Sequence, residues 1–365
     1  AYSIKHAVII HTPIELCLPY AVIGKECPHT KKGMKMETPK KEKKEPSSGV
    51  KMYALVLGVS QFANKKIPEV PGAANDALLW GSYLKSRGFK VIYLINENAT
   101  KFKVKEALNK IASSLTDGDI FILFAASHGT PKNVDGEVGI VLYDSGEIKG
   151  NKYGCSKMPP SEPHLQAANK MCVLIKDSLS IREDVLSLLK NKKVIFIPIL
   201  DACYSGDALR GYLGEVVKSE TISPLDFYEK RLRELAPQSL YMVLASASGF
   251  RQAYGYDPSN FTEIRTVFKR GIDELPFNVQ IKTKDGASTV APHGVFSFYF
   301  VNGLNFNEHS ISKTYEATKE AINKDSELVC NIEKKRGRTI RVVSDCPKGG
   351  QNPVLLKIRG EDFKF

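Results

Sequence analysis

The sequence lacks the features that would mark three large classes of protein. It has no apolar run of the roughly 18 to 20 residues that a transmembrane helix needs. Its cysteines include no C-x-x-C pair, the spacing typical of structural zinc sites. The formal net charge is +12, but the basic residues are spread along the chain and form no recognised nucleic-acid-binding module. We therefore expect no membrane span, no zinc site and no nucleic-acid partner.

What is present is typical of a soluble globular protein large enough to bury a sizeable core. The 365 residues are 42% hydrophobic and 25% charged. One stretch departs from this composition, because residues 31–48 contain seven lysines, two prolines and almost no apolar side chain. Such a composition predicts a flexible linker that proteases reach easily. We interpret residues 1–50 as an N-terminal segment with a Lys-rich linker, a candidate pro-region.

Six of the seven cysteines fall into three local pairs, which leaves Cys203 alone. The pairs are Cys17 with Cys27, Cys155 with Cys172, and Cys330 with Cys346. If they are disulfides, the protein functions in an oxidising compartment, secreted or extracytoplasmic, or comes from a hyperthermophile. The alternative is that they are free buried thiols, and the spacing alone does not decide between the two.

Short apolar runs alternate with amphipathic segments along most of the chain. The runs at 53–58, 91–95, 120–126 and 194–201 predict strands, and the segments between them predict helices, including one that follows Thr100 and one that starts in a capping box at Ser180. This order indicates βαβ units and a parallel sheet. A polar region at 131–180, with a small hairpin expected at 139–144, interrupts the series.

The pattern resumes beyond a long polar connection, in which we expect one helix near 225–235. The remaining segments predict a strand within 239–248, helices at 293–304 and 311–322, and a closing strand at 352–358. The predicted fold class is α/β, with a mostly parallel central sheet of about six strands flanked by helices in three layers.

Two strands end in residues that can perform chemistry. The run V-I-F-I-P-I-L-D-A-C-Y-S-G at 194–206 ends by presenting Cys203, and the strand at 120–126 leads into His128 and Gly129. Because the carboxyl ends of parallel strands meet at one edge of the sheet, the thiol and the imidazole can meet there. An imidazole activates a thiol and protonates the leaving amine, and the backbone N–H groups of Gly129 and Cys203 can bind an oxyanion. A lone cysteine or histidine would be read as structural; the pair predicts a nucleophilic dyad.

These motifs resemble those of the caspase-like cysteine peptidases of clan CD, family C14, and most closely those of metacaspases. The resemblance rests on S-H-G and D-A-C-Y-S-G, on Y-A-L-V-L-G-V-S and G-A-A-N-D-A, and on H-G-V-F-S-F-Y-F-V-N-G-L. It implies a caspase-like fold with a large-subunit-like part at 51–206, a connecting segment with a processing site at 207–238, and a small-subunit-like part of the same domain at 239–365. It also implies a His128/Cys203 dyad that hydrolyses peptide bonds without a third catalytic residue.

The resemblance further implies a substrate preference. Asp76 and Asp201 match the residues that line the pocket for the P1 side chain in metacaspases, and Ser127 matches a residue at its border. Two carboxylates in a confined pocket attract Arg or Lys and repel Asp. Caspases have Gln in place of Asp201 and an Arg shortly before the Gly matched by Gly72, where this chain has Val70. We therefore expect cleavage after basic residues of peptide or protein substrates.

No cofactor or metal is predicted, with calcium activation as the alternative. Many metacaspases bind calcium through carboxylates after the histidine loop and near the cysteine. Asp135, Glu137 and Asp144 occupy the first region, but Arg210 falls where a ligand would be expected in the second. Because a calcium site needs six or more oxygens, solvated loop acids are the favoured interpretation.

The leading hypothesis is a cysteine endopeptidase specific for Arg or Lys, made as a zymogen that cuts its own basic segments. One alternative is another clan CD peptidase, of the legumain, gingipain or clostripain type, which the order of strands after Cys203 would distinguish. The other is a catalytically silent caspase-like scaffold that binds peptides or partners.

Overall fold

The fold is described from a computed structural model of the chain. The described residues are 49–130, 139–146, 163–202, 242–245, 293–335, 353–357 and 362–365, with the short stretches 9–10, 255–256, 280–282 and 288–290 and the single residues Cys155, Leu209 and Tyr212. The Lys-rich linker, Cys203 and the helix expected near 225–235 lie outside them.

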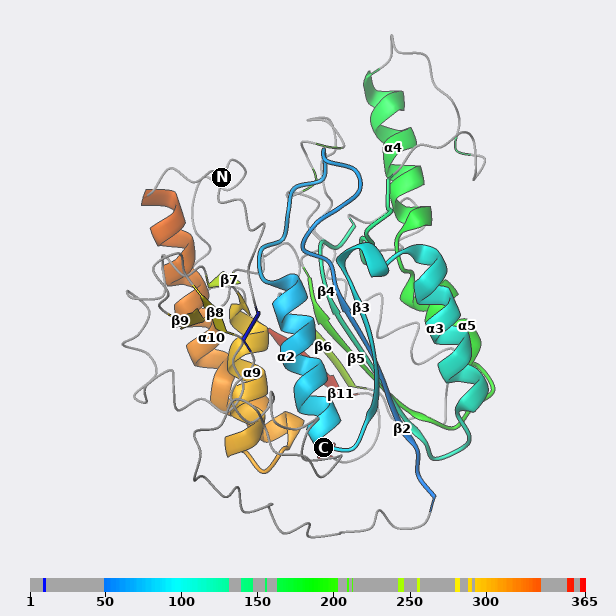
Figure 1. The fold of residues 1–365 in the computed structure, drawn as a ribbon, viewed down its shortest axis with the longest axis vertical. Coiled ribbons are helices and arrows are strands. Elements are labelled where there is room, and N and C mark those ends of the chain that lie inside the picture. Colours follow the sequence, from blue (N-terminus) through cyan, green and yellow to red (C-terminus); the bar gives the residue numbers. More distant parts are fainter. Residues whose placement is uncertain are drawn as a thin grey trace, which may run out of the picture.

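A six-stranded sheet in the order β11-β6-β5-β4-β2-β3 forms the centre of the molecule (Figure 1). Five strands are parallel and β11 is antiparallel at one edge. Their bounds are β2 (Met52–Gly58), β3 (Lys90–Ile95), β4 (Ile120–Ala126), β5 (Ile195–Asp201), β6 (Met242–Ala245) and β11 (Val354–Lys357). The predicted fold class is confirmed. The physical reason is that unbroken runs of Val, Ile, Leu and Phe suit strands covered on both faces.

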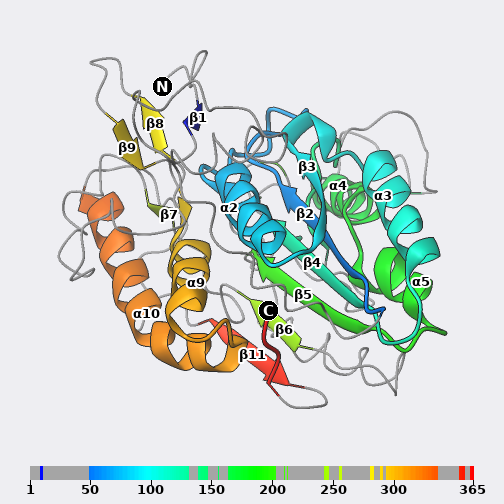
Figure 2. The same ribbon diagram turned by 60° about the horizontal axis from the view of Figure 1, so that its bottom comes forward.

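Helices cover both faces of the sheet, which gives the three expected layers (Figure 2). One face carries α2 (Ala73–Ser86), α9 (Val295–Phe306) and α10 (Ile311–Lys335). The other carries α3 (Lys101–Ser114), the helical turn Ile181–Leu186 and α5 (Ser187–Leu189). Successive residues of each strand point to opposite faces of the sheet, because the strand is pleated. Val56, Phe124 and Ile199 pack on the first side, and Leu57, Leu123 and Leu200 pack on the second.

The predicted helix starts have clear local causes. Thr100 is the N-cap of α3, and its side chain accepts a hydrogen bond from the Lys103 N–H at 3.3 Å. The Ser180 hydroxyl accepts a hydrogen bond from the Glu183 N–H at 3.1 Å, which confirms the start predicted there. Side-chain oxygens at these positions satisfy N–H groups that have no partner within the helix.

Several elements differ from the sequence-based expectation. The helix predicted from residue 293 begins at Val295, because β10 (His293–Gly294) pairs antiparallel with β7 (Gly255–Tyr256). The helix predicted to stop at 322 continues to Lys335 as α10. The hairpin expected at 139–144 is absent from those residues: Ile140 instead forms single bridges to Gly129 and Leu179.

The structure adds a helix and a small sheet to the elements named above. Helix α4 (Pro163–Asp177) lies within the region interpreted as polar, although its A-A-N-K-M-C-V-L-I stretch has apolar residues at helical spacing. A small sheet joins β1 (Ile9–Ile10), β8 (Gln280–Lys282) and β9 (Ser288–Val290), so the apolar residues 9–10 pair with a segment far along the chain.

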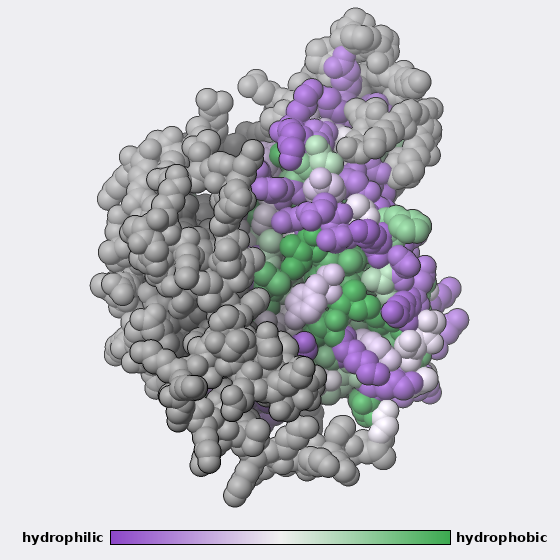
Figure 3. All heavy atoms as spheres, in the orientation of Figure 1, coloured by the Kyte–Doolittle hydropathy of each residue, from purple (hydrophilic) through white to green (hydrophobic). Residues whose placement is uncertain are grey.

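The visible face of the described residues combines an apolar centre with a hydrophilic border (Figure 3). The apolar centre lies over the edge strand β3, where Val91 to Ile95 are partly exposed. Among the helices of the described residues, none has the length and apolar character needed to cross a membrane.

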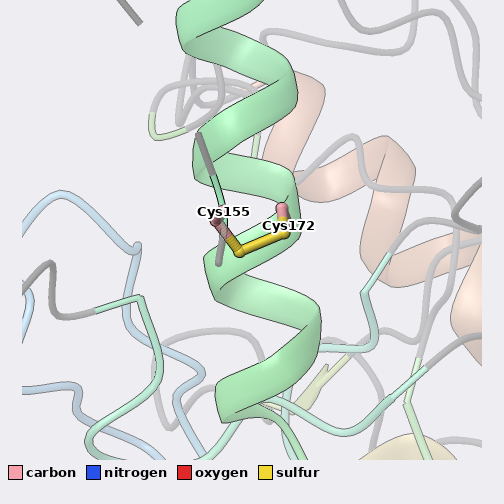
Figure 4. The surroundings of a disulfide bond; sticks show 2 residues. All are labelled: Cys155 and Cys172. Carbon is pink, nitrogen blue, oxygen red and sulfur yellow. A yellow bond between two sulfur atoms is a disulfide. The ribbon is translucent and has the colours of Figure 1, made fainter. Parts of the chain in front are cut away.

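A disulfide joins Cys155 to Cys172 of α4, which confirms one of the three predicted pairs (Figure 4). Cys330 on α10 is also disulfide-bonded, but its partner lies outside the described residues. The pairings of Cys330 with Cys346 and of Cys17 with Cys27 stay predictions, as does the oxidising compartment.

We expect the double variant Cys155→Ser/Cys172→Ser to lose about 3 kcal/mol in free energy of unfolding, the cost of releasing a loop of this length in the unfolded chain. Denaturant unfolding of the variant and the wild type measures the difference. Adding reductant to the double variant gives the separate contribution of the disulfide that Cys330 forms. Equal stability of the two oxidised proteins would contradict the prediction.

Candidate active site

The carboxyl ends of β4 and β5 are neighbours at one edge of the sheet. Ala126 is paired with Asp201, and the Ser127 N–H donates to the Asp201 carbonyl at 3.4 Å. His128 follows Ala126 by two positions, and Cys203 follows Asp201 by two positions. The structure thus brings His128 to the end of the strand that leads to Cys203, which itself lies outside the described residues.

The His128 ring is held by two residues of the loop after β2. Its Nε2–H donates to the Pro68 carbonyl at 2.8 Å, and the ring stacks on Phe62 with centroids 5.4 Å apart. A neutral imidazole held in this way carries its lone pair on Nδ1. Burial lowers the pKa of His128 to about 4, against the opposing effect of the Pro68 hydrogen bond. The imidazole is therefore neutral near pH 7 and able to accept a proton.

The loop after His128 is held by backbone hydrogen bonds to residues 139–141. The Val141 N–H donates to the His128 carbonyl and the Thr130 N–H donates to the Gly139 carbonyl, each at 2.8 Å. Neither of these bonds uses the Gly129 N–H. The oxyanion role predicted for Gly129 and for the Cys203 N–H stays a prediction.

The Ser127 hydroxyl donates to the Val141 carbonyl at 2.6 Å, within the protein. By the pleat of β4, Ser127 continues the side of Ala125, which packs toward α3, whereas Asp201 continues the side of Ile199, which packs toward α2 and α9. The pocket role predicted for Ser127 stays a prediction.

Asp76 and Asp201 come together from two different elements. Asp76 lies in the first turn of α2 and is 2% exposed, and Asp201 is the last residue of β5 and is 7% exposed. A methyl group built on Gly294 would lie 2.7 Å from Oδ2 of Asp201 and 2.9 Å from Oδ2 of Asp76. The two carboxylates therefore approach one point in front of the Gly294 Cα. Their role as the pocket for the P1 side chain stays a prediction.

Each carboxylate is bound by a donor from the β10–α9 segment. Nδ1 of His293 lies 2.9 Å from Oδ1 of Asp76, and the Gly294 N–H donates to both oxygens of Asp76 at 3.0 and 2.9 Å. The Ser297 hydroxyl donates to Oδ2 of Asp201 at 2.5 Å and accepts from the Trp80 indole N–H at 3.2 Å.

Burial raises the pKa of Asp76, while the His293 hydrogen bond and charge and the Gly294 N–H act in the opposite direction. The position of Asp76 at the start of α2 adds a further preference for negative charge. A cation that entered between the two carboxylates would favour their ionised forms.

Sequence reasoning missed the residues that hold the site in place. Pro68 and Phe62 lie in a loop with no regular pattern, and their proximity to His128 is a tertiary fact. His293, Gly294 and Ser297 lie in the H-G-V-F-S motif, which contributes to the predicted helix and to the family resemblance but carries no predicted role in the site. The available signal was that His293 comes just before, and Ser297 lies within, an otherwise strongly apolar stretch.

Of the acids considered for calcium, only Asp144 lies in the described part of the chain. Asp144 accepts a hydrogen bond from the Lys101 N–H at 2.9 Å, at the start of α3. Asp135, Glu137 and Arg210 lie outside the described residues. Across the residues that are described, no three metal-binding side chains form a cluster. The absence of a cofactor and of calcium dependence stays a prediction.

This site lies at the carboxyl edge of an α/β sheet flanked by helices, the arrangement of a clan CD peptidase. A family model described as the caspase domain of peptidase family C14 matches residues 51–291. Because the match covers more than half of the chain, the protein belongs to this family of caspase-domain cysteine peptidases.

Comparison of structures and of curated sequences adds little to the family assignment. One solved structure similar to this chain is protein GSU0716 from Geobacter sulfurreducens, at 16% sequence identity, with 84% of this chain and 93% of that chain covered and a TM-score of 0.41. No curated protein sequence gives a significant match.

Proposed function

We propose that this caspase-domain protein is a cysteine endopeptidase that uses His128 and Cys203 to cleave peptide bonds after Arg or Lys. The observation that carries the specificity is the approach of the Asp76 and Asp201 carboxylates to one point in front of Gly294. The strand end that bears His128 is paired with the strand that leads to Cys203, which supports the dyad.

In the proposed mechanism, Nδ1 of His128 accepts the proton of the Cys203 thiol as sulfur attacks the substrate carbonyl carbon. The new C–S bond yields a tetrahedral oxyanion, to which the N–H groups of Gly129 and Cys203 donate. The imidazolium returns the proton to the departing amine as the C–N bond breaks. Water, deprotonated by His128, then hydrolyses the thioester and regenerates the thiol.

The Pro68 carbonyl has a defined part in this sequence of proton transfers. It accepts the Nε2–H of His128 at 2.8 Å, which fixes the tautomer that leaves Nδ1 basic. The same contact stabilises the imidazolium once it forms. Because the acceptor is a backbone carbonyl, orientation of the histidine does not require a third catalytic side chain.

The specificity follows from charge and burial. A guanidinium or ammonium group that fills the space between two buried carboxylates forms charge-assisted hydrogen bonds, whereas an Asp side chain would add a third negative charge. Protein or peptide substrates with a basic P1 residue are therefore expected.

Peptide profiling tests the proposal directly. We expect the wild type to hydrolyse matched fluorogenic peptides with Arg or Lys at P1 and to leave the Asp peptide intact, and we expect Cys203→Ala to be inactive on all of them. Activity confined to the Asp peptide, or retained in Cys203→Ala, would contradict the proposal. If the protein hydrolyses none of the peptides, either with its N-terminal and connecting segments intact or after they are cut, the silent scaffold is favoured.

We also propose self-processing within residues 31–48 and 207–238, both outside the described residues. The support is the composition of the first segment, with seven lysines, and the pocket chemistry that would accept them. Mass spectrometry of the wild type beside Cys203→Ala gives the cut sites. Fragments that appear equally in both proteins would assign the cleavage to another protease.

A further inference from the structure

His293 is fully buried and forms a hydrogen bond to one of the two pocket carboxylates. Its ring has a relative exposure of 0% and its Nδ1 lies 2.9 Å from Oδ1 of Asp76. Its other nitrogen, Nε2, is buried without a hydrogen-bond partner among the described residues. Burying a polar ring with one unpaired nitrogen costs free energy. We infer that the hydrogen bond to Asp76 is the reason that the ring occupies this position.

The backbone around His293 is shaped so that this contact can form. Gly72, the residue before α2, has φ of 101°, and a methyl group there would lie 3.1 Å from the Cα of His293. This close approach lets β10 pass across the start of α2, where the imidazole meets Asp76 and the Gly294 N–H spans both of its oxygens. His293 lies in the C-terminal part of the chain, whereas Asp76 lies in the N-terminal part.

The geometry leaves one oxygen of Asp76 directed toward the space it shares with Asp201. Oδ1 is occupied by His293 and Gly294, while Oδ2 shares the Gly294 N–H and lies on the side of the Asp201 carboxylate. The titratable groups in the described residues that face Asp76 are His293 from β10 and Asp201 from β5. Rotation of the Asp76 side chain away from this arrangement would break its hydrogen bonds to both His293 and Gly294.

We propose that His293 is a positioning residue that determines P1 specificity, because it holds the Asp76 carboxylate turned toward the Asp201 carboxylate so that the pair selects a cationic P1 side chain. This inference rests on the proposed function. His293 itself does not touch the substrate; it acts through Asp76.

The test compares P1 arginine with P1 citrulline, a neutral isostere, in otherwise identical peptides. The wild type is expected to prefer arginine, and His293→Phe is expected to lose at least about tenfold of the arginine-to-citrulline ratio in kcat/KM while still cleaving the citrulline peptide. His293→Asn, whose amide can donate to Asp76, is expected to recover part of the ratio. A matched control is His309→Gln, since His309 pairs with the Tyr83 hydroxyl in the turn between α9 and α10 and its loss should leave the ratio unchanged.

The pH dependence separates positioning from mere loss of structure. Without His293, burial of Asp76 is opposed only by the Gly294 N–H and the helix, so its pKa rises further and its negative charge is lost at higher pH. The arginine-to-citrulline ratio of His293→Phe should therefore recover as the pH is raised, more steeply than in the wild type. In an Asp76→Asn background, His293→Phe should change the ratio no further.

The outcomes for the two proposals can be told apart. If the wild type shows no preference for arginine over citrulline, the proposed basic specificity fails. If the wild type prefers arginine and His293→Phe keeps the full ratio at every pH, or lowers it equally in the Asp76→Asn background, the role of His293 fails while the specificity stands. If His293→Phe does not fold, the same double-variant comparison is made with His293→Asn. That variant is expected to lower the arginine-to-citrulline ratio less than Asp76→Asn does, and to lower it no further in the Asp76→Asn background.

Discussion

His128→Ala is expected to lower kcat/KM by at least about a thousandfold on any substrate, because the proton acceptor and the donor to the leaving amine are lost together. Steady-state hydrolysis of the arginine peptide measures the loss. His128→Gln keeps a side chain that can donate to the Pro68 carbonyl, at 2.8 Å from the ring in the wild type, and should be equally inactive. Phe62→Leu, which removes only the ring that stacks on His128, should cost less activity than His128→Ala because the imidazole itself remains.

The dyad should also show strong non-additivity. Because His128 and Cys203 act in one proton transfer, the double variant His128→Ala/Cys203→Ala should be no slower than either single variant. Additive losses would indicate that the two residues act separately. Retention of more than about a tenth of the wild-type rate by His128→Ala would remove the histidine from the mechanism.

The acid limit of the reaction follows from the state of His128. Burial lowers its pKa from 6.5 to about 4, so the neutral base persists to lower pH than an ordinary histidine would allow. With the citrulline peptide, which avoids the charge of the P1 pocket, the acid limb of kcat/KM should lie well below pH 6.5. An acid limb at or above pH 6.5 would contradict a neutral resting imidazole. The same depressed pKa means that this group's stabilisation of the fold is present above pH 6.5 and lost as the pH falls toward 4.

Asp201→Asn is expected to lower kcat/KM for the arginine peptide by about a hundredfold or more while changing the citrulline peptide little, because one partner of a buried charge pair is removed. The substitution is well suited to the site, since the Ser297 hydroxyl that now donates to Asp201 can instead accept from the amide. Competition between the two peptides in one reaction measures the ratio directly.

Asp76→Asn should act in the same direction with a larger cost in stability, since the Gly294 N–H donates to both oxygens of Asp76 and an amide supplies only one acceptor. A matched control is Asp325→Asn, another buried carboxylate, which accepts from the Tyr299 hydroxyl at 2.7 Å on the α9–α10 side. It should leave the arginine-to-citrulline ratio unchanged. An unchanged ratio in both Asp201→Asn and Asp76→Asn would rule out this pocket as the source of basic specificity.

Much of the central sheet could be predicted because its signals are local. The strands at 52–58, 90–95, 120–126 and 195–201 are unbroken apolar runs, and their alternation with helices implies parallel pairing. The helix starts at Thr100 and Ser180 depend on one side chain each and were also correct. The start of α9 was not, since β10 exists only because another segment of the chain pairs with it.

The sequence by itself determined the parallel α/β architecture, the family, and the position of His128 at the end of a strand, because these depend on residues close together in the chain. The residues that orient the site were decided only by tertiary structure: Pro68 and Phe62 around His128, and His293, Gly294 and Ser297 around the two carboxylates. The hydrogen bonds around the two carboxylates join parts of the chain about a hundred to two hundred residues apart. A hydrogen bond across such a separation leaves no periodic pattern in either segment. Burial by the fold also sets the direction of both pKa shifts, since it raises the pKa of Asp76 and lowers that of His128.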